Sequence, residues 1–389
     1  MEKIKLIVFP GNFLPHTGGL ESHVDNFVKY LSKNYDNYEI TIFTPNTENA
    51  LSSEYIHNDV LVLRYPAFFI VNNFPFPKFW KLQFYKMLIE LYMQDYSVVM
   101  TRTMFFVNTT LGTLFAKFRL SSIKLIHVEH GSDYSKLDSK IVSLVNKFYM
   151  QTLGKLTLKL SNRIVCVSEA GKTFLRENFN IKKRIDLIYR GVDKEYFASI
   201  KKSEYFDKYK WKKNIVFAGR LIDGKGVQDI IEVLSKLDST FMLHIIGDGE
   251  YKSKLEGLAN KFNLKNINFI GKLKHRELIA VLKQKPLFIN PSYTEGLPTS
   301  VLDALFSYCP IIATNVGGTE EILKSKWNIN SYYQLYTAKN TQELQDKILN
   351  YFKINVVGPD VEEEMKQFDW NEHARQYNTI IHEMLQLTT

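Results

Sequence analysis

The chain has 389 residues, which is enough for two domains that each bury a core. Hydrophobic residues make up 45% of it and charged residues 23%, which are ordinary globular proportions and exclude a disordered chain. The net charge is +9, and the sequence contains no run of eighteen apolar residues that would predict a membrane-spanning helix. The opening MEKIKLIVFPGN has too short an apolar core for a secretory signal, so it predicts a first strand in a cytoplasmic protein.

The first half of the chain alternates strands and helices. An apolar strand at 5–9 is followed by a loop to Thr17 and by Gly18-Gly19, which open an amphipathic helix to about Leu31. Glycines at a helix start let a ligand approach the backbone, and their N–H groups point outward. Strands are expected at 39–44, 60–64 and 98–101, with a helix near 107–118.

Residues 65–92 are unusually rich in aromatic residues and prolines. If exposed, this segment would be an acceptor groove or a surface that dips into lipid. The alternative is a loop and a helix packed on the core. Both interpretations stay open.

A strand at 124–128 ends in Glu129-His130-Gly131. Ligands bind at the carboxyl ends of strands in open α/β sheets, so His130 is well placed for a substrate, and Gly131 would let that substrate approach. Strands are also expected at 163–167 and 185–189, and the polar, lysine-rich stretch 194–213 fits a linker.

Residues 140–160 predict one long helix with lysines and no acidic residue. Leu144, Phe148, Leu153 and Leu156 supply apolar surface to it. Such a basic amphipathic helix could rest on anionic lipid, which would make the protein peripheral at the inner face of the membrane, or it could face the core as an ordinary helix. Nucleic acid is disfavoured as a partner, because no zinc-finger spacing, RNA-recognition signature or basic zipper is present.

A strand at 214–218 restarts the alternation and leads into a glycine-bearing loop at 219–226. Arg220 and Lys225 lie five positions apart on this loop. Arginine can bind a diphosphate through its bidentate fork and lysine as a point charge, and the following helix terminus would assist both. The loop therefore predicts a diphosphate clamp.

The stretch at 287–305 carries two carboxylates around a predicted strand-to-helix turn. The apolar strand 287–289 is followed by a polar loop with Glu295, and Pro298 is expected at the first helical position. Asp303 would lie roughly 8 Å along that helix at 1.5 Å per residue. Two carboxylates so spaced could grip two parts of one long polar ligand, and simple capping or a solvated face is the alternative.

Further strands and helices complete the second half. Strands are expected at 243–246, 267–270, 311–314 and 332–338, a loop-to-helix turn at 317–321, and helices at 341–352, 359–367 and 370–387.

Several of these motifs, in this order, resemble the retaining glycosyltransferases of family 4. Glu295 with an acid eight positions later resembles their E-x7-E signature, with Asp303 in place of the second Glu. The loop at 219–226 resembles their Arg-x4-Lys-Gly loop, and Gly247-Asp248-Gly249-Glu250 resembles their GDGP turn, with Glu250 in place of Pro. The resemblance implies the α/β GT-B fold: two Rossmann-like domains, 1–198 and 205–369, facing across a cleft, with a closing helix at 370–387 that packs back on the first domain.

The family resemblance also implies an activity. It is the metal-independent, cofactor-free transfer of a sugar, with retention, from a nucleoside-diphosphate sugar to a hydroxyl of a glycan or lipid-linked glycan, in cell-envelope polysaccharide or glycolipid assembly. A UDP-sugar is favoured over a GDP-sugar. The usual account of retention in the family is front-face attack, in which the donor phosphate helps take the acceptor proton.

The resemblance carries roles onto named residues. The expected catalytic residues are Glu295, His130, Arg220 and Lys225. The expected diphosphate contacts are Gly18, Gly19, Arg220, Lys225, Gly296 and Leu297. The expected ribose and nucleotide contacts are Asp303, Gly247, Gly271 and Lys272, and the expected acceptor-side residues are Glu21 and Glu129.

Other classes of protein also pair two α/β domains. A nucleotide-dependent dehydrogenase is disfavoured because no G-x-G-x-x-G follows any predicted strand. A nucleotide-sugar epimerase on the same fold, or a non-catalytic sugar-binding protein, stays open as an alternative.

Overall fold

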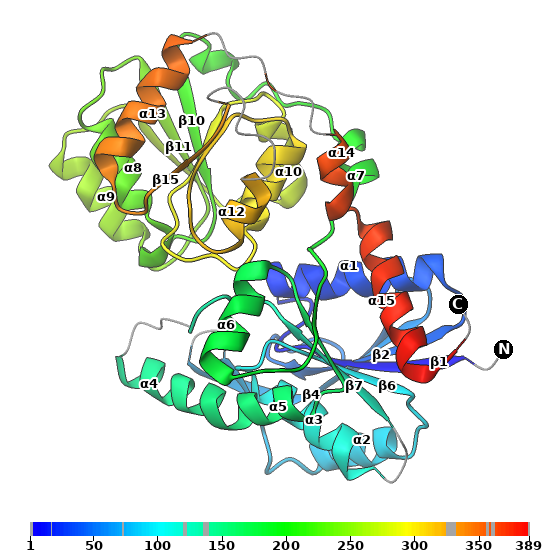
Figure 1. Cartoon of the computed structure of the whole chain (residues 1–389). Coiled ribbons are helices and arrows are strands. Elements are labelled where there is room, and N and C mark those ends of the chain that lie inside the picture. Colours follow the sequence, from blue (N-terminus) through cyan, green and yellow to red (C-terminus); the bar gives the residue numbers. More distant parts are fainter. Residues whose placement is uncertain are drawn as a thin grey trace. The chain divides into compact units, whose positions relative to one another are not determined.

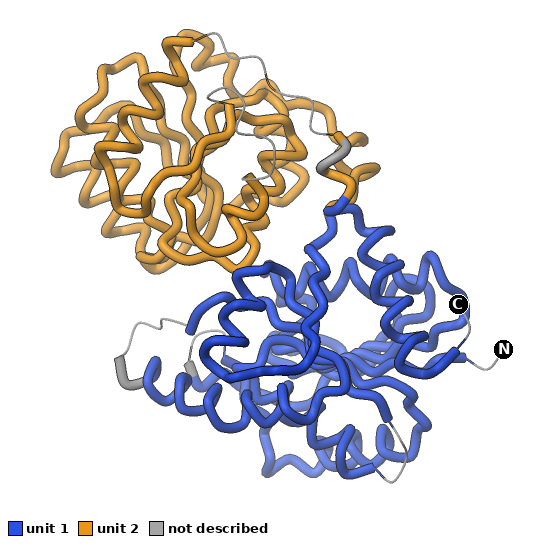
Figure 2. Tube along the Cα trace, viewed as in Figure 1, with its two compact units in different colours: residues 1–191, 367–389 blue, residues 192–366 orange. Residues whose placement is uncertain are grey.

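The computed structural model describes residues 3–16, 18–71, 74–119, 123–134, 140–323, 332–354, 358 and 362–387. It divides the chain into two compact units, residues 1–191 with 367–389, and residues 192–366 (Figure 2). Each unit is built around its own sheet with helices packed on it (Figure 1). The expected α/β class is confirmed.

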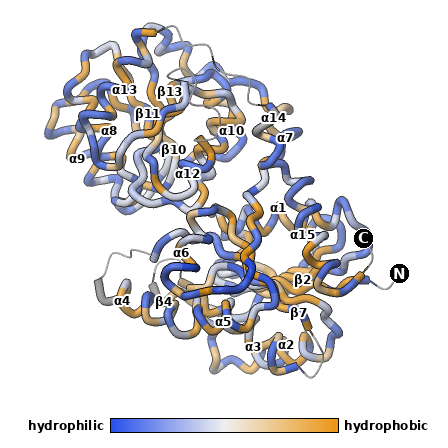
Figure 3. The backbone as a smooth tube through the Cα atoms, viewed as in Figure 1, coloured by the Kyte–Doolittle hydropathy of each residue, from blue (hydrophilic) through white to orange (hydrophobic). Residues whose placement is uncertain are grey.

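The first unit holds a mostly parallel sheet in the order β3-β4-β2-β1-β6-β7-β8-β9, with β5 paired to β4. Its strands are β1 (Ile4–Phe9), β2 (Tyr38–Asn46), β3 (Ser53–Ile56), β4 (Val60–Val71), β5 (Phe74–Pro77), β6 (Val98–Arg102), β7 (Lys124–Glu129), β8 (Arg163–Cys166) and β9 (Ile185–Leu187). Central strands such as β1 and β6 are buried almost throughout, because helices cover both faces of the sheet (Figure 3).

The helices of the first unit are α1 (Gly19–Asn34), α2 (Leu82–Tyr92), α3 (Val107–Phe118), α4 (Lys140–Tyr149), α5 (Lys155–Leu160), α6 (Glu169–Phe179) and the closing helix α15 (Trp370–Leu385). A π-helical turn, Met150–Gly154, joins α4 to α5. Helices α1 and α15 lie side by side, and the rings of Phe27 and Tyr377 meet at 5.0 Å between centroids. The closing helix thus packs against the first unit, as the fold prediction expected.

The second unit holds a parallel sheet in the order β12-β11-β10-β13-β14-β15. Its strands are β10 (Lys213–Ala218), β11 (Phe241–Ile246), β12 (Ile267–Gly271), β13 (Leu287–Asn290), β14 (Ile311–Thr314) and β15 (Tyr333–Tyr336). Its helices are α7 (Lys194–Ser199), α8 (Val227–Leu234), α9 (Lys252–Lys261), α10 (His275–Leu282), α11 (Thr299–Phe306), α12 (Gly318–Leu323), α13 (Thr341–Lys353) and α14 (Glu362–Met365).

The strand order of the second sheet reverses between β10 and β13. From β10 the chain proceeds outward through β11 and β12, and from β13 it proceeds the other way through β14 and β15. In open α/β sheets, ligands bind at the carboxyl edge at such a reversal. The loops that follow β10 and β13 lie there.

The aromatic segment 65–92 is divided between strand, hairpin and helix. Strand β4 runs on to Val71, and β5 pairs back on it. Tyr65 and Phe84 are buried in the core, whereas Trp80 and Leu82 are exposed. The core-packed interpretation therefore holds for part of the segment, and a role of the exposed part in acceptor or lipid contact stays a prediction.

The predicted helix at 140–160 is confirmed as one continuous helical segment, in which a π-helical turn lies between α4 and α5. The side chains of Leu144 and Phe148 are exposed to 69% and 70%, which contradicts a core-facing helix at those positions. Met150 and Leu158, further along, are buried. Asn146 in α4 is also buried, so both parts of the segment have residues facing the core, and α4 has an exposed apolar face as well.

The predicted linker at 194–213 is wrong, because much of it is folded on the second unit. Residues 194–199 form α7, and Lys283 donates hydrogen bonds to the Phe197 and Ile200 carbonyls at its end. The ring of Tyr209 packs on His244 at 4.9 Å. The lysine content predicted a solvent-exposed segment. The aromatic residues between the lysines, however, supply apolar surface that packs on the second unit.

The predicted bounds of two helices also differ from those in the structure. Pro298 is the N-cap of α11 and not its first helical residue, since its ψ of 113° is extended. The helix predicted at 359–367 is described at 362–365 and continues as a 3-10 turn over Lys366–Phe368. Thr17 and residues 359–361 lie outside the described residues.

Candidate active site

The loops at the carboxyl edge of the second sheet are tied to one another by backbone hydrogen bonds. The Leu221 N–H donates to the Asp248 carbonyl at 2.9 Å, and the Gly247 N–H donates to the Gly271 carbonyl at 2.9 Å. Gly247 and Gly271 have positive φ, 142° and 83°, a region that favours glycine. The predicted nucleotide-contacting glycines thus lie together.

A backbone hydrogen bond joins the loop after β10 to the loop after β13. The Tyr293 N–H donates to the Gly224 carbonyl at 2.9 Å. Gly226 has a φ of +66°, and a Cβ there would lie 2.1 Å from the Pro291 carbonyl oxygen. The two loops approach so closely that only glycine fits at position 226.

A network of side-chain hydrogen bonds also joins the loop after β13 to α8. The Tyr293 hydroxyl donates to Asp229 Oδ1 on α8 at 2.8 Å, and Gln228 Nε2 donates to that hydroxyl at 2.9 Å. Burial raises the pKa of the Asp229 carboxyl. None of these three residues was predicted from the sequence, since a tyrosine in a polar loop gives no local sign of its partner.

Lys225 and Glu295 form an ion pair across the strand-order reversal. Lys225 Nζ lies 2.6 Å from Glu295 Oε1, and the two side chains are 26% and 9% exposed. Arg220, on the same loop as Lys225, is exposed. The structure therefore joins the predicted cationic clamp to the predicted sugar-binding carboxylate, 70 residues away.

Gly296 and Leu297, also predicted as site residues, directly follow Glu295 on the loop after β13. The Gly318 N–H of α12 donates to the Gly296 carbonyl at 2.9 Å, and Leu297 is buried beside it. Lys272 is exposed on the loop after β12.

Asp303 has a partner that the sequence did not suggest. Its Oδ1 lies 3.1 Å from His275 Nε2, and the His275 ring stacks on Tyr196 at 5.7 Å with 8° between the planes. The side chain of Asp303 is 13% exposed and that of His275 is 52% exposed. A carboxylate paired with an accessible imidazole can accept or share hydrogen bonds with ligand hydroxyls.

In the first unit, the start of α1 brings Gly18, Gly19 and Glu21 together. Gly18 is the extended N-cap, and the Gly19 carbonyl accepts from Arg190 Nη1 at 2.7 Å. The Glu21 side chain is buried, with Oε1 3.1 Å from His16 Nδ1.

The Glu129 side chain is buried and accepts hydrogen bonds from nearby backbone. It is 1% exposed, and its carboxylate accepts hydrogen bonds from the N–H groups of Met104, His130 and Gly131 at 2.8–3.0 Å. This carboxylate holds the backbone after β7 in place, and the acceptor contact expected of Glu129 stays a prediction. The sequence could not show the burial, because a carboxylate after a strand is usually exposed.

His130 lies in a buried cluster. Its ring meets the His23 ring edge-on at 4.6 Å, and its Nε2 is buried without a hydrogen-bond partner among the described residues. Burial, with Arg102 nearby, lowers the pKa of His130 well below its ordinary value, so the ring is neutral. Arg102 Nη1 donates to His23 Nδ1 at 2.8 Å.

Two negative findings concern the described part of the chain. There, no group of three or more His, Cys, Asp or Glu side chains is arranged to hold a metal ion. No helix among the described residues is both long and apolar enough to cross a membrane.

Solved structures share this architecture. Sucrose-phosphate synthase from Thermosynechococcus elongatus matches with a TM-score of 0.81 at 16% identity, covering 99% of this chain and all of that one. Anabaena HepE in complex with UDP-glucose matches with a TM-score of 0.66 at 16% identity, covering 98% and 99%. The likeness shows that this chain has the GT-B fold of glycosyltransferases.

Sequence relatives place the chain within that class. The model of glycosyl transferases group 1 matches residues 200–368, and that of glycosyltransferase family 4 matches residues 17–196. An uncharacterized glycosyltransferase of Methanocaldococcus jannaschii is 38% identical over 99% of this chain and all of its own length. UDP-Gal:alpha-D-GlcNAc-diphosphoundecaprenol alpha-1,3-galactosyltransferase of Escherichia coli is 28% identical over 69% of this chain and 73% of its own. The chain belongs to glycosyltransferase family 4.

Proposed function

We propose that this glycosyltransferase transfers a sugar, with retention and without a metal ion, from a UDP-sugar to a hydroxyl of a glycan or lipid-linked glycan in cell-envelope assembly. The observation that carries the proposal is the Lys225–Glu295 pair at 2.6 Å, at the strand-order reversal and on the same loop as Arg220. A phosphate clamp and a sugar-binding carboxylate in contact suit a ligand whose diphosphate and sugar are neighbours.

The proposed mechanism assigns the charge of the leaving group to two side chains. As the anomeric bond breaks, the diphosphate accumulates negative charge, which the Arg220 guanidinium and the Lys225 ammonium would stabilise. Lysine has three N–H donors, so Lys225 can keep Glu295 and still donate to a phosphate oxygen. Gly18, Gly19, Gly296 and Leu297 would add backbone N–H groups.

Glu295 would hold the sugar hydroxyls and orient the anomeric carbon. Asp303, with His275 at 3.1 Å, would hold the ribose, while Gly247, Gly271 and Lys272 would lie against the nucleotide. His130 would touch the sugar from the first unit as a neutral imidazole, and Glu21 would lie on the acceptor side. These roles extend the family resemblance to the contacts described above.

The preference for UDP and for a lipid-linked acceptor is supported by relatives. HepE was solved with UDP-glucose, and the Escherichia coli relative is named for a UDP-sugar donor and a diphosphoundecaprenol-linked acceptor. We extend both features to this chain as part of the proposal.

A thermal-shift screen with UDP, GDP, ADP and their sugars, with magnesium or with chelator, tests the donor and the metal. A ligand at 100 times its Kd stabilises by about 2.7 kcal/mol. We expect UDP and a UDP-sugar to raise the Tm equally under both conditions. A shift that needs magnesium would contradict metal independence, and conversion of the donor without acceptor would favour an epimerase.

Arg220→Ala tests the clamp. The change should cost about 2–4 kcal/mol of transition-state stabilisation, comparable to losing an oxyanion donor, measured as kcat/KM with the identified donor. Arg176→Ala, at an exposed position on α6, is the matched control and should keep wild-type rates. Near-native turnover in Arg220→Ala would rule the clamp out.

A further inference from the structure

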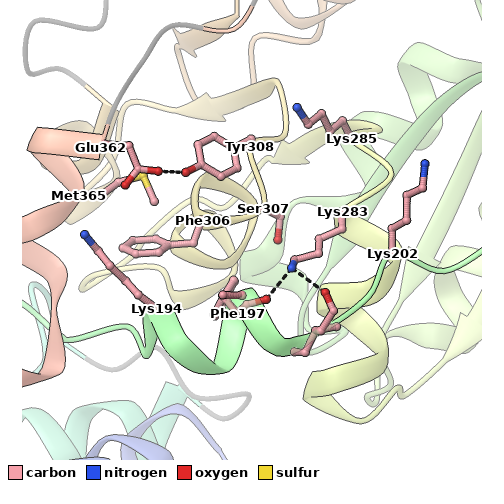
Figure 4. Close-up of a pocket in the computed structure, with 12 residues that line it drawn as sticks. Lys194, Phe197, Lys202, Lys283, Lys285, Phe306, Ser307, Tyr308, Glu362 and Met365 are labelled. Carbon is pink, nitrogen blue, oxygen red and sulfur yellow. Dashed lines mark hydrogen bonds between the residues drawn. The ribbon is translucent and has the colours of Figure 1, made fainter.

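A pocket lies in the second unit, between α7 and the end of α11. Its volume is about 520 Å3, within the range of small-molecule sites (Figure 4). Helix α11 starts beside the Glu295 loop and ends at this pocket, and Lys285 on its wall precedes β13. The pocket therefore lies toward the amino ends of the strands, whereas the proposed donor site lies at their carboxyl ends.

The charge around this pocket is strongly positive. Its described lining includes four lysines and one acidic residue, Glu362. The lysines are Lys194, Lys202, Lys283 and Lys285. Glu362 accepts a hydrogen bond from the Tyr308 hydroxyl at the wall. An anion entering the pocket would meet a surplus of cations even with Glu362 ionised.

Two polar groups on the pocket wall are held in place and have hydrogen-bonding capacity that the described residues do not use. Lys283 Nζ donates to the Phe197 carbonyl at 2.5 Å and to the Ile200 carbonyl at 2.6 Å, which leaves one of its three N–H groups. The Ser307 hydroxyl is buried without a hydrogen-bond partner among the described residues, and Ser307 is 2% exposed. Figure 4 shows both groups on the same side of the pocket. Buried hydroxyls are normally paired, so an unpaired one on the wall of a cationic pocket indicates a missing acceptor.

The rest of the wall is apolar. Phe197 and Phe306 pack together at 5.8 Å between ring centroids, and Met365 lies across from them. A ligand that suits this wall has an apolar or ring-shaped part in addition to its charge.

We propose that this pocket binds a phosphate monoester that carries a ring-sized organic group. A phosphate monoester has a charge near −2 at neutral pH and three acceptor oxygens, which match the remaining Lys283 N–H, the Ser307 hydroxyl and the lysines at the rim. Its organic group lies against Phe197 and Phe306. This site is separate from the donor site and does not depend on the proposed function.

Phenyl phosphate is a suitable probe, titrated into the full-length protein and followed by calorimetry. Wild-type protein is expected to bind it more tightly than phenol or inorganic phosphate. Lys202→Gln/Lys285→Gln, which changes two exposed rim lysines, should weaken binding about fivefold. Lys201→Gln/Lys353→Gln removes the same charge at exposed positions outside the pocket and should leave the Kd unchanged.

Two further variants locate the binding. Ser307→Ala should also weaken the binding of phenyl phosphate, in protein whose circular dichroism and Tm match the wild type. Arg220→Ala should leave it unchanged, because Arg220 belongs to the donor loop. Loss of binding in Arg220→Ala with unchanged binding in the rim variant would assign the phosphate to the donor loop and overturn the proposal, as would the absence of binding to wild-type protein.

Discussion

At the scale of single residues, Gly226 shows how closely the two clamp loops approach. Its φ is +66°, and a Cβ would lie 2.1 Å from the backbone oxygen of Pro291, which cannot move without shifting the Glu295 loop. Gly224, two positions earlier on the same loop, has no atom within 4 Å of the place where a Cβ would be built. Substituting Gly226 and Gly224 in turn therefore separates the effect of backbone crowding from the effect of losing a glycine.

We therefore predict that Gly226→Ala displaces the loop that carries Lys225. The change should destabilise the protein by about 1–3 kcal/mol and abolish the nucleotide-induced rise in Tm. Gly224→Ala should stay within about 1 kcal/mol of wild type and keep nucleotide binding. Urea unfolding and calorimetric titration measure the two effects, and equal behaviour of both variants would contradict the role given to Gly226.

At the scale of elements, the closing helix α15 is held to the first unit by a buried aromatic and histidine cluster. His373 on α15 meets His23 on α1 at 5.0 Å and Trp370 at 4.4 Å between ring centroids. Burial lowers the pKa of His23, His130 and His373 well below the ordinary value, with further lowering by Arg102. These rings are neutral when folded, so protonation favours the unfolded chain.

The sign of the resulting pH dependence follows from linkage. A histidine with a lowered folded pKa contributes full stability above its unfolded pKa of about 6.5, and that stability is lost as the pH falls below it. Each such histidine adds a slope of up to about 1.4 kcal/mol per pH unit. We predict that the free energy of unfolding falls steeply below pH 6.5.

His373→Phe tests this prediction. It removes one titrating group without leaving a buried polar atom, so the loss of stability between pH 6.5 and 5.5 should shrink by about 1 kcal/mol. Phe27→Leu, in the same helix interface, should lower stability at every pH and keep the wild-type slope. Urea unfolding across this range measures both, and an unchanged slope in His373→Phe would refute the linkage.

At the scale of the whole molecule, helix α4 leaves an apolar face uncovered by the described chain. Leu144, Val145 and Phe148 are 69%, 62% and 70% exposed, and Lys147 lies among them. An exposed apolar face with a basic residue suits an anionic lipid surface, where a lipid-linked acceptor would be found.

We predict that the protein co-sediments with anionic liposomes and much less with neutral ones. Leu144→Asn/Phe148→Asn should weaken this binding, because the two side chains would insert into the interface. Leu51→Asn/Ile354→Asn changes two similarly exposed apolar residues outside α4 and serves as the control. Equal, negligible sedimentation with both kinds of liposome would rule out this membrane surface.

Much of the architecture could be predicted from the sequence because its signals are local. The apolar run at 287–289 lies in the buried strand β13, the strand before Arg220 is also largely buried, and the helix over 107–118 has the predicted bounds. Arg220 and Lys225 were found as candidates because both lie on one loop. The linker prediction at 194–213 failed because lysine content outweighed the aromatic residues that pack on His244.

The sequence by itself determined the α/β alternation and the candidate residues of each loop, since strand and helix periods depend on neighbours a few positions apart. Only the tertiary structure decided that Lys225 meets Glu295, that His275 supports Asp303, and that Glu129 turns inward. Strand order and burial arise from contacts between segments far apart in the chain. The energies of these contacts depend on the packing of the whole unit, which no local pattern encodes.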